Sequence, residues 1–267
     1  MLKSRLYLLL IASGLTLSCV TGAADLTDAD QIVHQANLVQ YYAADDGRSI
    51  ARMTIIDARG NRQMRQFTIL RKDVEEGADQ RYLVVFSRPP DVHGTVFRVE
   101  KHVKRDDDRW LYLPDLDLVK RISAGDKRTS FVGTHYYYED VSGRNENEDA
   151  HELEETTDTY YVIKNTPRNP GSVEFAYYRA WVDKKSFLPM KSIYYDQSDK
   201  EYRRIEVEKT EDFQGHTTAT QVKVSDLISG GHTLAQFRYI QYDMGMPDNI
   251  FSERSLRNPP AKWLKAQ

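Results

Sequence analysis

The sequence predicts a mainly β protein built on a large, curved antiparallel sheet or barrel. About ten or eleven short segments rich in Val, Ile, Thr, Tyr and Phe follow one another at the spacing of hairpins. The segments are not separated by helices, which parallel strands would need as crossovers. Several segments also carry bulky apolar residues on both faces, which indicates that both faces of the sheet are at least partly covered.

The chain begins with the features of an exported protein. Two basic residues precede an apolar run at 6–17, and small residues follow up to Ala24. These are the three parts of a secretory signal peptide, and the apolar run is too short to span a bilayer comfortably. We therefore predict that residues 1–23 are a cleaved signal peptide, that residues 24–267 form a single domain, and that the protein is exported from the cytoplasm.

Cys19, the only cysteine, offers an alternative to simple cleavage. The tripeptide Leu17-Ser18-Cys19 weakly resembles a lipoprotein signal, in which acyl chains on the cysteine would anchor the protein to a membrane. If the leader is cleaved instead, the mature chain has no thiol. It then has no disulfide and no thiolate metal site, and burial alone must hold its core together.

The mature chain would be mildly acidic. Cleavage would remove Lys3 and Arg5 but none of the 40 acidic residues, which changes the formal net charge from −3 to −5. Nucleic acid as the main partner would require concentrated positive charge, so that class is excluded. The remaining length of roughly 243 residues is enough for one large β domain, and no break in the pattern requires a second.

The first predicted element is a helix over Thr27–Ala44. Thr27 or Asp28 can cap its N-terminus, and Asp28 and Asp30 favour the positive end of the helix dipole. Apolar residues recur at helical spacing at Ile32, Ala36, Val39 and Ala43. One face of this amphipathic helix must lie on an apolar surface. It is either an ordinary packing helix or a lid over a sheet.

Six strands are predicted between residues 49 and 122. The turn Arg59-Gly60-Asn61 joins the first two, because such residues are typical of tight hairpins. A charged turn at 104–108 separates another pair. The predicted strands are Ser49–Asp57, Arg62–Arg71, Arg81–Ser87, Val96–Val103, Arg109–Leu113 and Leu116–Ile122.

The pattern changes between residues 123 and 158. Ser123–Tyr138 contains two glycines, a cluster of polar and charged residues and three consecutive tyrosines, which indicate a loop. Ser142–Asp158 is strongly acidic and almost free of apolar residues, so we predict a solvated, mobile loop.

Six more strands are predicted after this region. They are Thr159–Asn165, Val173–Asp183, Pro189–Asp196, Tyr202–Lys209, Thr217–Ile228 and His232–Tyr242. After the last of them, a short helix is predicted around Phe251–Leu256.

Val173–Asp183 shows the two-sided apolar pattern most clearly. Tyr177 and Trp181 fall on one face, and Tyr178 and Val182 fall on the other. A helix can cover one face, and a bound apolar ligand or a barrel interior can cover the second. A plain two-layer core with aromatic residues at its rim would give the same pattern. The 17 tyrosines suit the wet edge of a hydrophobic cavity, although Tyr is also a good strand residue.

The sequence contains no recognisable catalytic pattern. None of the seven histidines stands at a known ligand spacing, and the motifs of serine hydrolases, dinucleotide-binding folds and P-loops are absent. The carboxylates, including Asp106-Asp107-Asp108, have the character of solvated turns. We predict a protein that is not an enzyme and has no cofactor and no metal. A periplasmic hydrolase remains the least favoured hypothesis.

A basic segment stands out in this acidic chain. It consists of Lys120, Arg121, Lys127 and Arg128. These residues could contact anionic lipid headgroups or an acidic patch on a partner. A solvated loop would have the same composition.

Four short motifs between residues 86 and 141 carry a family resemblance. They are Phe86-Ser87-Arg88-Pro89-Pro90-Asp91-Val92-His93-Gly94-Thr95, Trp110-Leu111-Tyr112-Leu113-Pro114, Lys120-Arg121-Ile122-Ser123, and Ser130-Phe131-Val132-Gly133 with Tyr138-Glu139-Asp140. In order and spacing they resemble the LolA-like outer-membrane lipoprotein-sorting family of Gram-negative bacteria, in its longer, largely uncharacterised branch. The resemblance extends more loosely over the mature chain, including Leu188-Pro189-Met190.

The resemblance implies an incomplete antiparallel β-barrel with a few helices covering its concave face, and a cavity that takes up acyl chains. It implies a periplasmic carrier that binds the acyl chains of a lipid or lipoprotein and moves it toward the outer membrane, with transient contact to a membrane surface. Members of this branch are often associated with RND/MMPL-type inner-membrane exporters. The alternative is therefore an accessory subunit that docks onto such an exporter and carries nothing.

Six residues are the candidates for binding lipid: Phe97, Trp110, Tyr112, Phe131, Trp181 and Met190. The choice depends on which face of each strand points inward, and a shift of one residue in register inverts that assignment. The basic residues Lys120, Arg121, Lys127 and Arg128 are the candidates for contact with a partner or with headgroups. The helix at 27–44 and the loop at 123–138 are the candidates for a lid.

Overall fold

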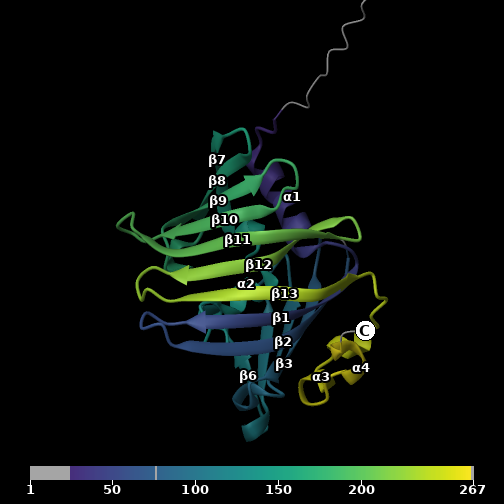
Figure 1. Cartoon of the computed structure of the whole chain (residues 1–267). Helices are drawn as coiled ribbons and strands as arrows, with labels where there is room; N and C mark the ends of the chain where they lie inside the picture. The colour runs from purple at the N-terminus through teal and green to yellow at the C-terminus, as the bar shows by residue number, and fades with distance from the viewer. Residues whose placement is uncertain (1–24, 76, 266–267) are drawn as a thin grey trace, which may run out of the picture.

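The computed structural model describes residues 25–75 and 77–265 (Figure 1). The predicted signal peptide and Cys19 lie outside the described residues. Thirteen strands form one antiparallel sheet, which curves around a concave face without closing into a barrel. The strands are β1 Asp46–Ile56, β2 Arg62–Asp73, β3 Gln80–Arg88, β4 Val96–Lys101, β5 Asp108–Leu113, β6 Leu118–Ile122, β7 Asp149–Thr156, β8 Tyr160–Pro167, β9 Tyr177–Asp183, β10 Pro189–Tyr195, β11 Glu201–Phe213, β12 His216–Asp226 and β13 His232–Tyr242.

The sheet is a meander whose two halves are joined by its first and last strands. The strand order is β6-β5-β4-β3-β2-β1-β13-β12-β11-β10-β9-β8-β7, so β1 pairs with β13. This leaves β6 and β7 as the two edges. Because these two strands are consecutive in the sequence, residues 123–148 must pass from one edge of the sheet to the other. We call this segment the crossover.

Two of the four α-helices of the described residues lie on the concave side. They are α1 (Ala29–Tyr41) and α2 (Tyr138–Ser142), which belongs to the crossover; α3 (Arg254–Arg257) and α4 (Ala261–Leu264) lie near the C-terminus. The predicted N-terminal helix is confirmed. The carboxylate of Asp28 accepts hydrogen bonds from the backbone N–H groups of Asp30 and Gln31, as an N-cap should. The buried face of α1 packs on β8 and β9 through Ile32 and Ala36.

The crossover fills the part of the concave side that lies over β2–β5. Its Phe131 ring packs at centroid distances of 5.9 Å from Phe67, 5.6 Å from Phe86 and 5.4 Å from Phe97. Tyr138 closes the same cluster, with its ring 5.5 Å from that of Phe131. These offset and edge-on contacts are the arrangements that aromatic rings prefer, and burying them anchors the middle of the crossover to the sheet.

The C-terminal segment covers the opposite face of the same strands (Figure 1). Phe251 and Leu256 are buried there against Leu70, Leu83 and other side chains of β2–β4. The carboxylate of Asp46 accepts hydrogen bonds from the backbone N–H groups of Met244 and Met246, which fixes the start of the segment. Strands β2–β5 are therefore covered on both faces, as the two-sided apolar pattern predicts.

The predicted number of strands and one predicted loop were wrong. The sheet has thirteen strands, against an expected total of about ten or eleven and twelve segments named individually. The strand that was not predicted is β7, because the acidic segment Ser142–Asp158 is not a solvated loop. It contains the short 3₁₀ turn Glu146–Glu148 and all of β7, which pairs with β8. His151 and Leu153 alternate with exposed glutamates along β7. The dense negative charge hides this period-two pattern, and backbone hydrogen bonds to β8 hold the strand regardless of charge.

Candidate functional site

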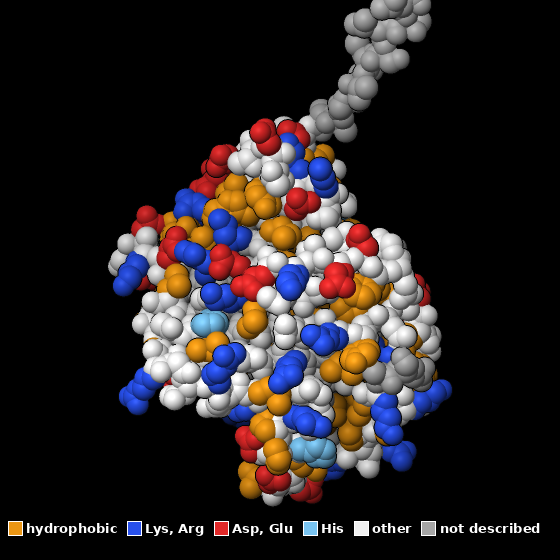
Figure 2. All heavy atoms as spheres, viewed as in Figure 1, with side chains coloured by type: hydrophobic (Ala, Val, Ile, Leu, Met, Phe, Trp, Pro, Cys, Tyr) orange, Lys and Arg blue, Asp and Glu red, His pale blue; other side chains and the backbone are white. Residues whose placement is uncertain are grey.

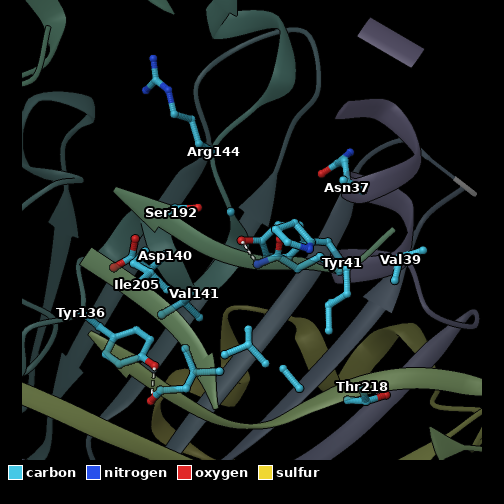
Figure 3. A pocket seen from close by; sticks show the side chains of 18 of the residues that line it. Asn37, Val39, Tyr41, Tyr136, Asp140, Val141, Arg144, Ser192, Ile205 and Thr218 are labelled. Atoms are coloured by element: carbon cyan, nitrogen blue, oxygen red, sulfur yellow. Dashed lines mark hydrogen bonds between the residues drawn. The ribbon is translucent and has the colours of Figure 1, made fainter. Parts of the chain in front are cut away.

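A cavity of about 390 Å³ lies on the concave side of the sheet (Figure 3). Its walls come from α1, the crossover and strands β1–β3 and β7–β13, so it occupies the part of the half-barrel that the aromatic cluster leaves empty. This volume falls within the range of natural ligand sites. The site thus depends on elements from both ends of the chain.

The wall formed by β11, β12 and β13 is largely apolar. Ile205, Val207, Ala219, Val222 and Phe237 line it, and all five remain partly exposed although they face the interior. They are exposed because the cavity lies in front of them. From the other side α1 contributes Val33, Ala36 and Val39. Such a space favours an apolar ligand, because burying apolar surface releases free energy without directed contacts.

The C-terminal end of α1 is fastened to the sheet by hydrogen bonds to its free carbonyl groups. The guanidinium of Arg71 on β2 donates to the backbone oxygens of Tyr41 (2.9 Å), Ala43 and Ala44 (2.8 Å). The Gln80 side chain donates to the Tyr41 oxygen as well, at 2.8 Å. The last carbonyls of a helix have no partner within the helix, so these bonds satisfy them and fix its end.

Apart from the packing of Ile32, the attachments of the N-terminal half of α1 are polar and partly exposed. His34 on α1 lies 3.1 Å from a carboxylate oxygen of Glu146 in the crossover. Before the helix, Asp25 pairs with Lys184 at 2.6 Å, and the backbone N–H of Leu26 donates to the Tyr161 hydroxyl at 3.0 Å. Several of these groups are half exposed, so each contributes little on its own.

The ring of Tyr41 forms a closely packed corner of the cavity. It lies against Gly143, which has a φ of +79° and whose missing side chain leaves room for the ring; a Cβ at this position would overlap it. The ammonium of Lys101 lies 4.7 Å from the centroid of the Tyr41 ring and donates to the backbone oxygen of Ser142 at 2.7 Å. Burial lowers the pKa of Lys101 to about 8, against the opposing effect of Asp107.

A group of buried ion pairs fixes the rest of the crossover. Glu139 on α2 lies at its centre, with carboxylate oxygens 3.1 Å from the ammonium of Lys127, 2.5 Å from the guanidinium of Arg128 and 3.4 Å from that of Arg144. Burial alone would raise the pKa of Glu139, but these three cations hold it at about 2, well below its ordinary value. Glu139 is therefore ionised throughout the physiological range.

Further ion pairs extend this group to the strands. Arg144 binds Asp149 on β7 through two hydrogen bonds of 2.8 Å and 2.9 Å, and Arg203 on β11 pairs with Asp140. The Arg203 guanidinium also lies 4.1 Å from the centroid of the Tyr137 ring. Removing one member of such a buried pair leaves an uncompensated charge, which is strongly destabilising. The crossover is consequently a fixed part of the structure.

Of the six candidate lipid-binding residues, the structure places Phe131 on the cavity wall. Phe97 is fully buried next to it, in the aromatic cluster. Trp110 and Tyr112 lie on the opposite face of β5 and pack against the C-terminal segment. The register of the sheet decides this placement, because the neighbouring Leu111 takes the concave face.

The other two candidates lie on β9 and β10. The Trp181 ring is covered by the ammonium of Lys191, which is 3.7 Å from its centroid, whereas its neighbours Ala180 and Val182 line the cavity. Met190 is half-buried next to a register shift in β10 and is not among the lining residues. Figure 2 shows that in this view the outside of the sheet carries acidic and basic groups interspersed with hydrophobic ones.

The four basic candidates separate into two pairs. Lys127 and Arg128 point into the buried group around Glu139, and only 8% and 7% of their side-chain surfaces are exposed. Arg128 also binds Glu174. Lys120 and Arg121 on the edge strand β6 are exposed, and Arg121 pairs with Asp108. Only the second pair can reach an external partner.

One group of side chains has the composition of a metal site. Ligand atoms of Glu100, His102 and Asp108 lie within 4.8 Å of one another. Asp108 is already paired with Arg105 at 2.8 Å and with Arg121 at 2.5 Å. Glu100 is likewise paired, with Arg98. The arginines supply the positive charge that a metal ion would bring, so we interpret the group as a set of ion pairs.

Sequence reasoning missed the residues that form most of the wall. In Tyr202–Lys209 the apolar Ile205 and Val207 alternate with the charged Arg204, Glu206 and Glu208. This is the pattern of a strand with one face on an apolar space, and it could have identified that wall. No comparable signal marks Tyr41 or Gly143, because their role depends on a contact between distant segments.

The sequence of the chain matches one family model. A family model described as "Uncharacterized protein" matches residues 78–258. No curated protein matches the chain. Among the described residues, no helix is long and apolar enough to cross a membrane.

Three solved structures are similar over nearly their whole length. A DUF1329 family protein from Desulfovibrio piger has 29% identity and a TM-score of 0.78, over 85% of this chain and 97% of its own. A putative outer membrane lipoprotein-sorting protein domain from Vibrio parahaemolyticus has 24% identity and a TM-score of 0.77, over 86% and 98%. A LolA superfamily protein from Nitrosomonas europaea has 19% identity and a TM-score of 0.66, over 87% and 99%.

Proposed function

The chain belongs to the family whose model is described as "Uncharacterized protein", and it has the fold of a LolA superfamily protein. On this basis we propose that it is a periplasmic carrier. It takes the acyl chains of a lipid or lipoprotein into the cavity and moves this cargo toward the outer membrane. The observation that carries the proposal is the partly exposed apolar wall of β11–β13, which faces the cavity instead of a packed core.

The energetics suit a carrier. Burial of a methylene group is worth about 0.8 kcal/mol, so roughly ten methylenes supply about 8 kcal/mol before the costs of association are subtracted. The apolar wall supplies this without any directed chemistry. A ligand held by burial alone can be released when the cavity opens to another apolar environment.

Release requires a lid, and α1 is the better of the two candidates. The crossover is held by buried ion pairs around Glu139 and by the aromatic cluster around Phe131. The helix α1 is held by the packing of Ile32 and Ala36 on β8 and β9, by the hydrogen bonds of Arg71 and Gln80 at its C-terminal end, and by exposed or half-exposed pairs at the other end, but, among the described residues, by no buried ion pair like those of the crossover. Segments that move in function come from the less stable parts of a structure. We assign the lid to α1.

The test is binding of a fluorescent fatty acid, with a variant that fills the cavity. Ala180 lines the cavity, so Ala180→Phe should weaken binding at least tenfold while the fold is retained. Ala150→Phe is the matched control, because Ala150 is exposed on the edge strand β7 and its substitution should leave binding unchanged. Equal binding by both variants, or no binding by the unaltered protein, would contradict the carrier function.

The alternative is an accessory subunit that docks onto an RND/MMPL-type exporter and carries nothing. The exposed Lys120 and Arg121 on the edge strand β6 could contribute to such a contact. Pull-down from envelope fractions distinguishes the two functions. Capture of an exporter by the unaltered protein and equally by Ala180→Phe, without any co-purifying lipid, would favour docking.

A further inference from the structure

We propose that the outer face of β12, β13, β1 and β2, opposite the cavity, binds the surface of an anionic lipid bilayer. Four basic residues define this surface, which we call the basic face: Arg52, Arg62, Lys223 and Arg238. The inference goes beyond the carrier function, because the basic face would bring the protein to a membrane whatever the cavity holds.

The register of β1 and β2 places Arg52 and Arg62 on the outer face. The hydroxyl of Thr68 donates to the backbone oxygen of Leu264 in the C-terminal segment, so Thr68 faces outward. Side chains alternate along a strand, so Arg62, six positions earlier on β2, faces outward too. Gln66 shares that face and is the direct partner of Arg52 on β1. Directly paired residues point to the same side of a sheet, which places Arg52 beside Arg62.

The next two strands continue this surface. Arg238 on β13 is the partner of Ile50, which is two positions from Arg52 on β1. Lys223 on β12 is the partner of Leu234, which is four positions from Arg238 on β13. The three arginines of the basic face are exposed, and Lys223 is half-buried. All four cations therefore lie on one side of four neighbouring strands.

These cations have no counter-charge of their own. In the part of the chain that the structure describes, none of them lies within 4.0 Å of a carboxylate oxygen. The turns that join the strands contain Asp57 and Asp226, but each of these accepts hydrogen bonds from backbone N–H groups of its own turn. Glu206 on β11, the sheet neighbour of Lys223, marks the border of the basic face. The surface is therefore positive, although the formal net charge of the chain is −3.

Exposed apolar side chains lie among and beside the cations. In Figure 2, blue and orange side chains gather over β13, β1 and β2, and the red ones lie mostly above and below them. Tyr239, next to Arg238, is 60% exposed, and Ile228, in the turn between β12 and β13, is 75% exposed. Four further apolar residues of the face are partly exposed: Ile50, Ile56, Met64 and Leu234. Aromatic and aliphatic groups of this kind enter the headgroup region of a bilayer.

A bilayer suits this surface better than an acidic protein does. The cations are spread over four strands and, among the described residues, donate no side-chain hydrogen bond that would fix them for bidentate pairing with carboxylates. An anionic membrane requires only positive charge within reach, worth about fivefold in binding for each Lys or Arg, together with apolar groups at the contact. The basic face supplies both.

The experiment is co-sedimentation with lipid vesicles. Vesicles of phosphatidylcholine with about one-third phosphatidylglycerol should bind the unaltered protein at least tenfold more tightly than vesicles of phosphatidylcholine alone. Raising the salt concentration from about 0.05 M to about 0.5 M should release the protein, because salt screens the charges. The cavity-filling variant Ala180→Phe should bind the anionic vesicles as the unaltered protein does, since its change lies on the other face of the sheet.

Charge variants locate the contact. Arg52→Gln combined with Arg238→Gln removes two cations of the basic face and should weaken vesicle binding about 25-fold. Lys104→Gln combined with Lys185→Gln is the matched control, because it removes the same net charge from exposed lysines in the turns after β4 and β9. The control should weaken binding less than about threefold. Equal losses in the two double variants would overturn the proposal.

A second pair of variants tests the apolar contribution. Ile228→Ser should weaken vesicle binding at least threefold, as expected when an aliphatic side chain is partly buried on binding. Val74→Ser is the control, because Val74 is 49% exposed in the turn after β2, at the opposite end of that strand from the turn between β1 and β2. Its substitution should leave vesicle binding unchanged.

The outcomes separate this inference from the carrier function. Absence of binding to anionic vesicles would overturn it, and so would tighter binding to soluble poly-glutamate, which would assign the basic face to an acidic protein. The double arginine variant should still bind the fluorescent fatty acid, because the cavity lies on the other face. Vesicle binding by a protein that takes up no fatty acid would contradict the carrier function and leave this inference intact.

Discussion

The carboxylate of Glu139 lies 3.1 Å from the ammonium of Lys127, in a site where only 3% and 8% of the two side chains are exposed. Both residues belong to the crossover, yet they are twelve positions apart and meet only because α2 turns back over the preceding loop. The contact forms part of the group of ion pairs that holds the crossover in place. This difference in anchoring is the reason that we propose α1, and not the crossover, as the lid of the cavity.

Substitution of Glu139 by Gln should destabilise the protein markedly. It would leave Lys127, Arg128 and Arg144 buried without their shared counter-charge, and removing one partner of a buried ion pair typically costs about 3–5 kcal/mol. Urea unfolding at neutral pH measures the free energy of unfolding. Glu154→Gln is the control, since Glu154 forms a more exposed pair with Arg179 and should cost less than about 1 kcal/mol.

Glu139→Gln should also change how the free energy of unfolding depends on pH in the acidic range. The pKa of Glu139 is about 2 in the folded protein, below its ordinary value. Stability from this group is therefore complete above the unfolded pKa of about 4.3, and is lost as the pH falls toward 2. The difference in free energy of unfolding between the unaltered protein and Glu139→Gln should narrow over this range. A difference that stays constant from pH 5 to pH 2 would contradict the assignment.

Lys101 should make stability rise with pH in the alkaline range. Its folded pKa of about 8 lies below the ordinary lysine value of 10.5, so the unfolded chain binds more protons between these two pH values. The free energy of unfolding should increase from pH 8 to pH 10, by no more than about 3 kcal/mol. Lys101→Met removes the titrating group and should lack this increase. The same slope in both proteins would show that other groups cause it.

Gly143→Ala should displace the Tyr41 ring and disturb the corner of the cavity. Gly143 has a φ of +79°, so the substitution introduces backbone strain as well as overlap with the ring. Gly215→Ala separates the two effects, because Gly215 has a φ of +85° but no heavy atom within 4 Å of a built Cβ. We expect Gly143→Ala to cost about 1–3 kcal/mol more than Gly215→Ala. It should also weaken binding of the fatty-acid probe, which Gly215→Ala should not do.

Arg71→Met should loosen α1 without unfolding the sheet. The substitution removes the hydrogen bonds to the carbonyls of Tyr41, Ala43 and Ala44 and also the ion pair with Asp73, which keeps its hydrogen bond from Gln80. Hydrogen exchange of the α1 amides should accelerate at least tenfold, which corresponds to about 1.4 kcal/mol of local stability, while the strands stay protected. Arg52→Met on β1 replaces an exposed arginine and serves as the control. Unchanged protection of α1 would show that Arg71 does not fasten the helix.

Strand and helix positions could be predicted from the sequence because they follow from local patterns. Asp28 caps α1 as expected, and Arg59-Gly60-Asn61 forms the turn between β1 and β2. The exception is β7, in which charged side chains obscure the alternation. Of the predicted lipid-binding residues, Phe131 lines the cavity. Trp110 and Tyr112 lie on the other side of the sheet, because two-sided strands do not reveal which face points inward.

Local patterns in the sequence predicted a large, curved antiparallel sheet with an N-terminal helix, because hydrophobic period, helix caps and turn residues act between neighbours in the chain. Tertiary structure alone decided which faces line the cavity, that Lys127 and Arg128 are buried, and that Gly143 accommodates Tyr41. These features depend on the pairing of β1 with β13 and on the path of the crossover. Contacts between residues so far apart are set by the packing of the whole sheet, and no local pattern encodes them.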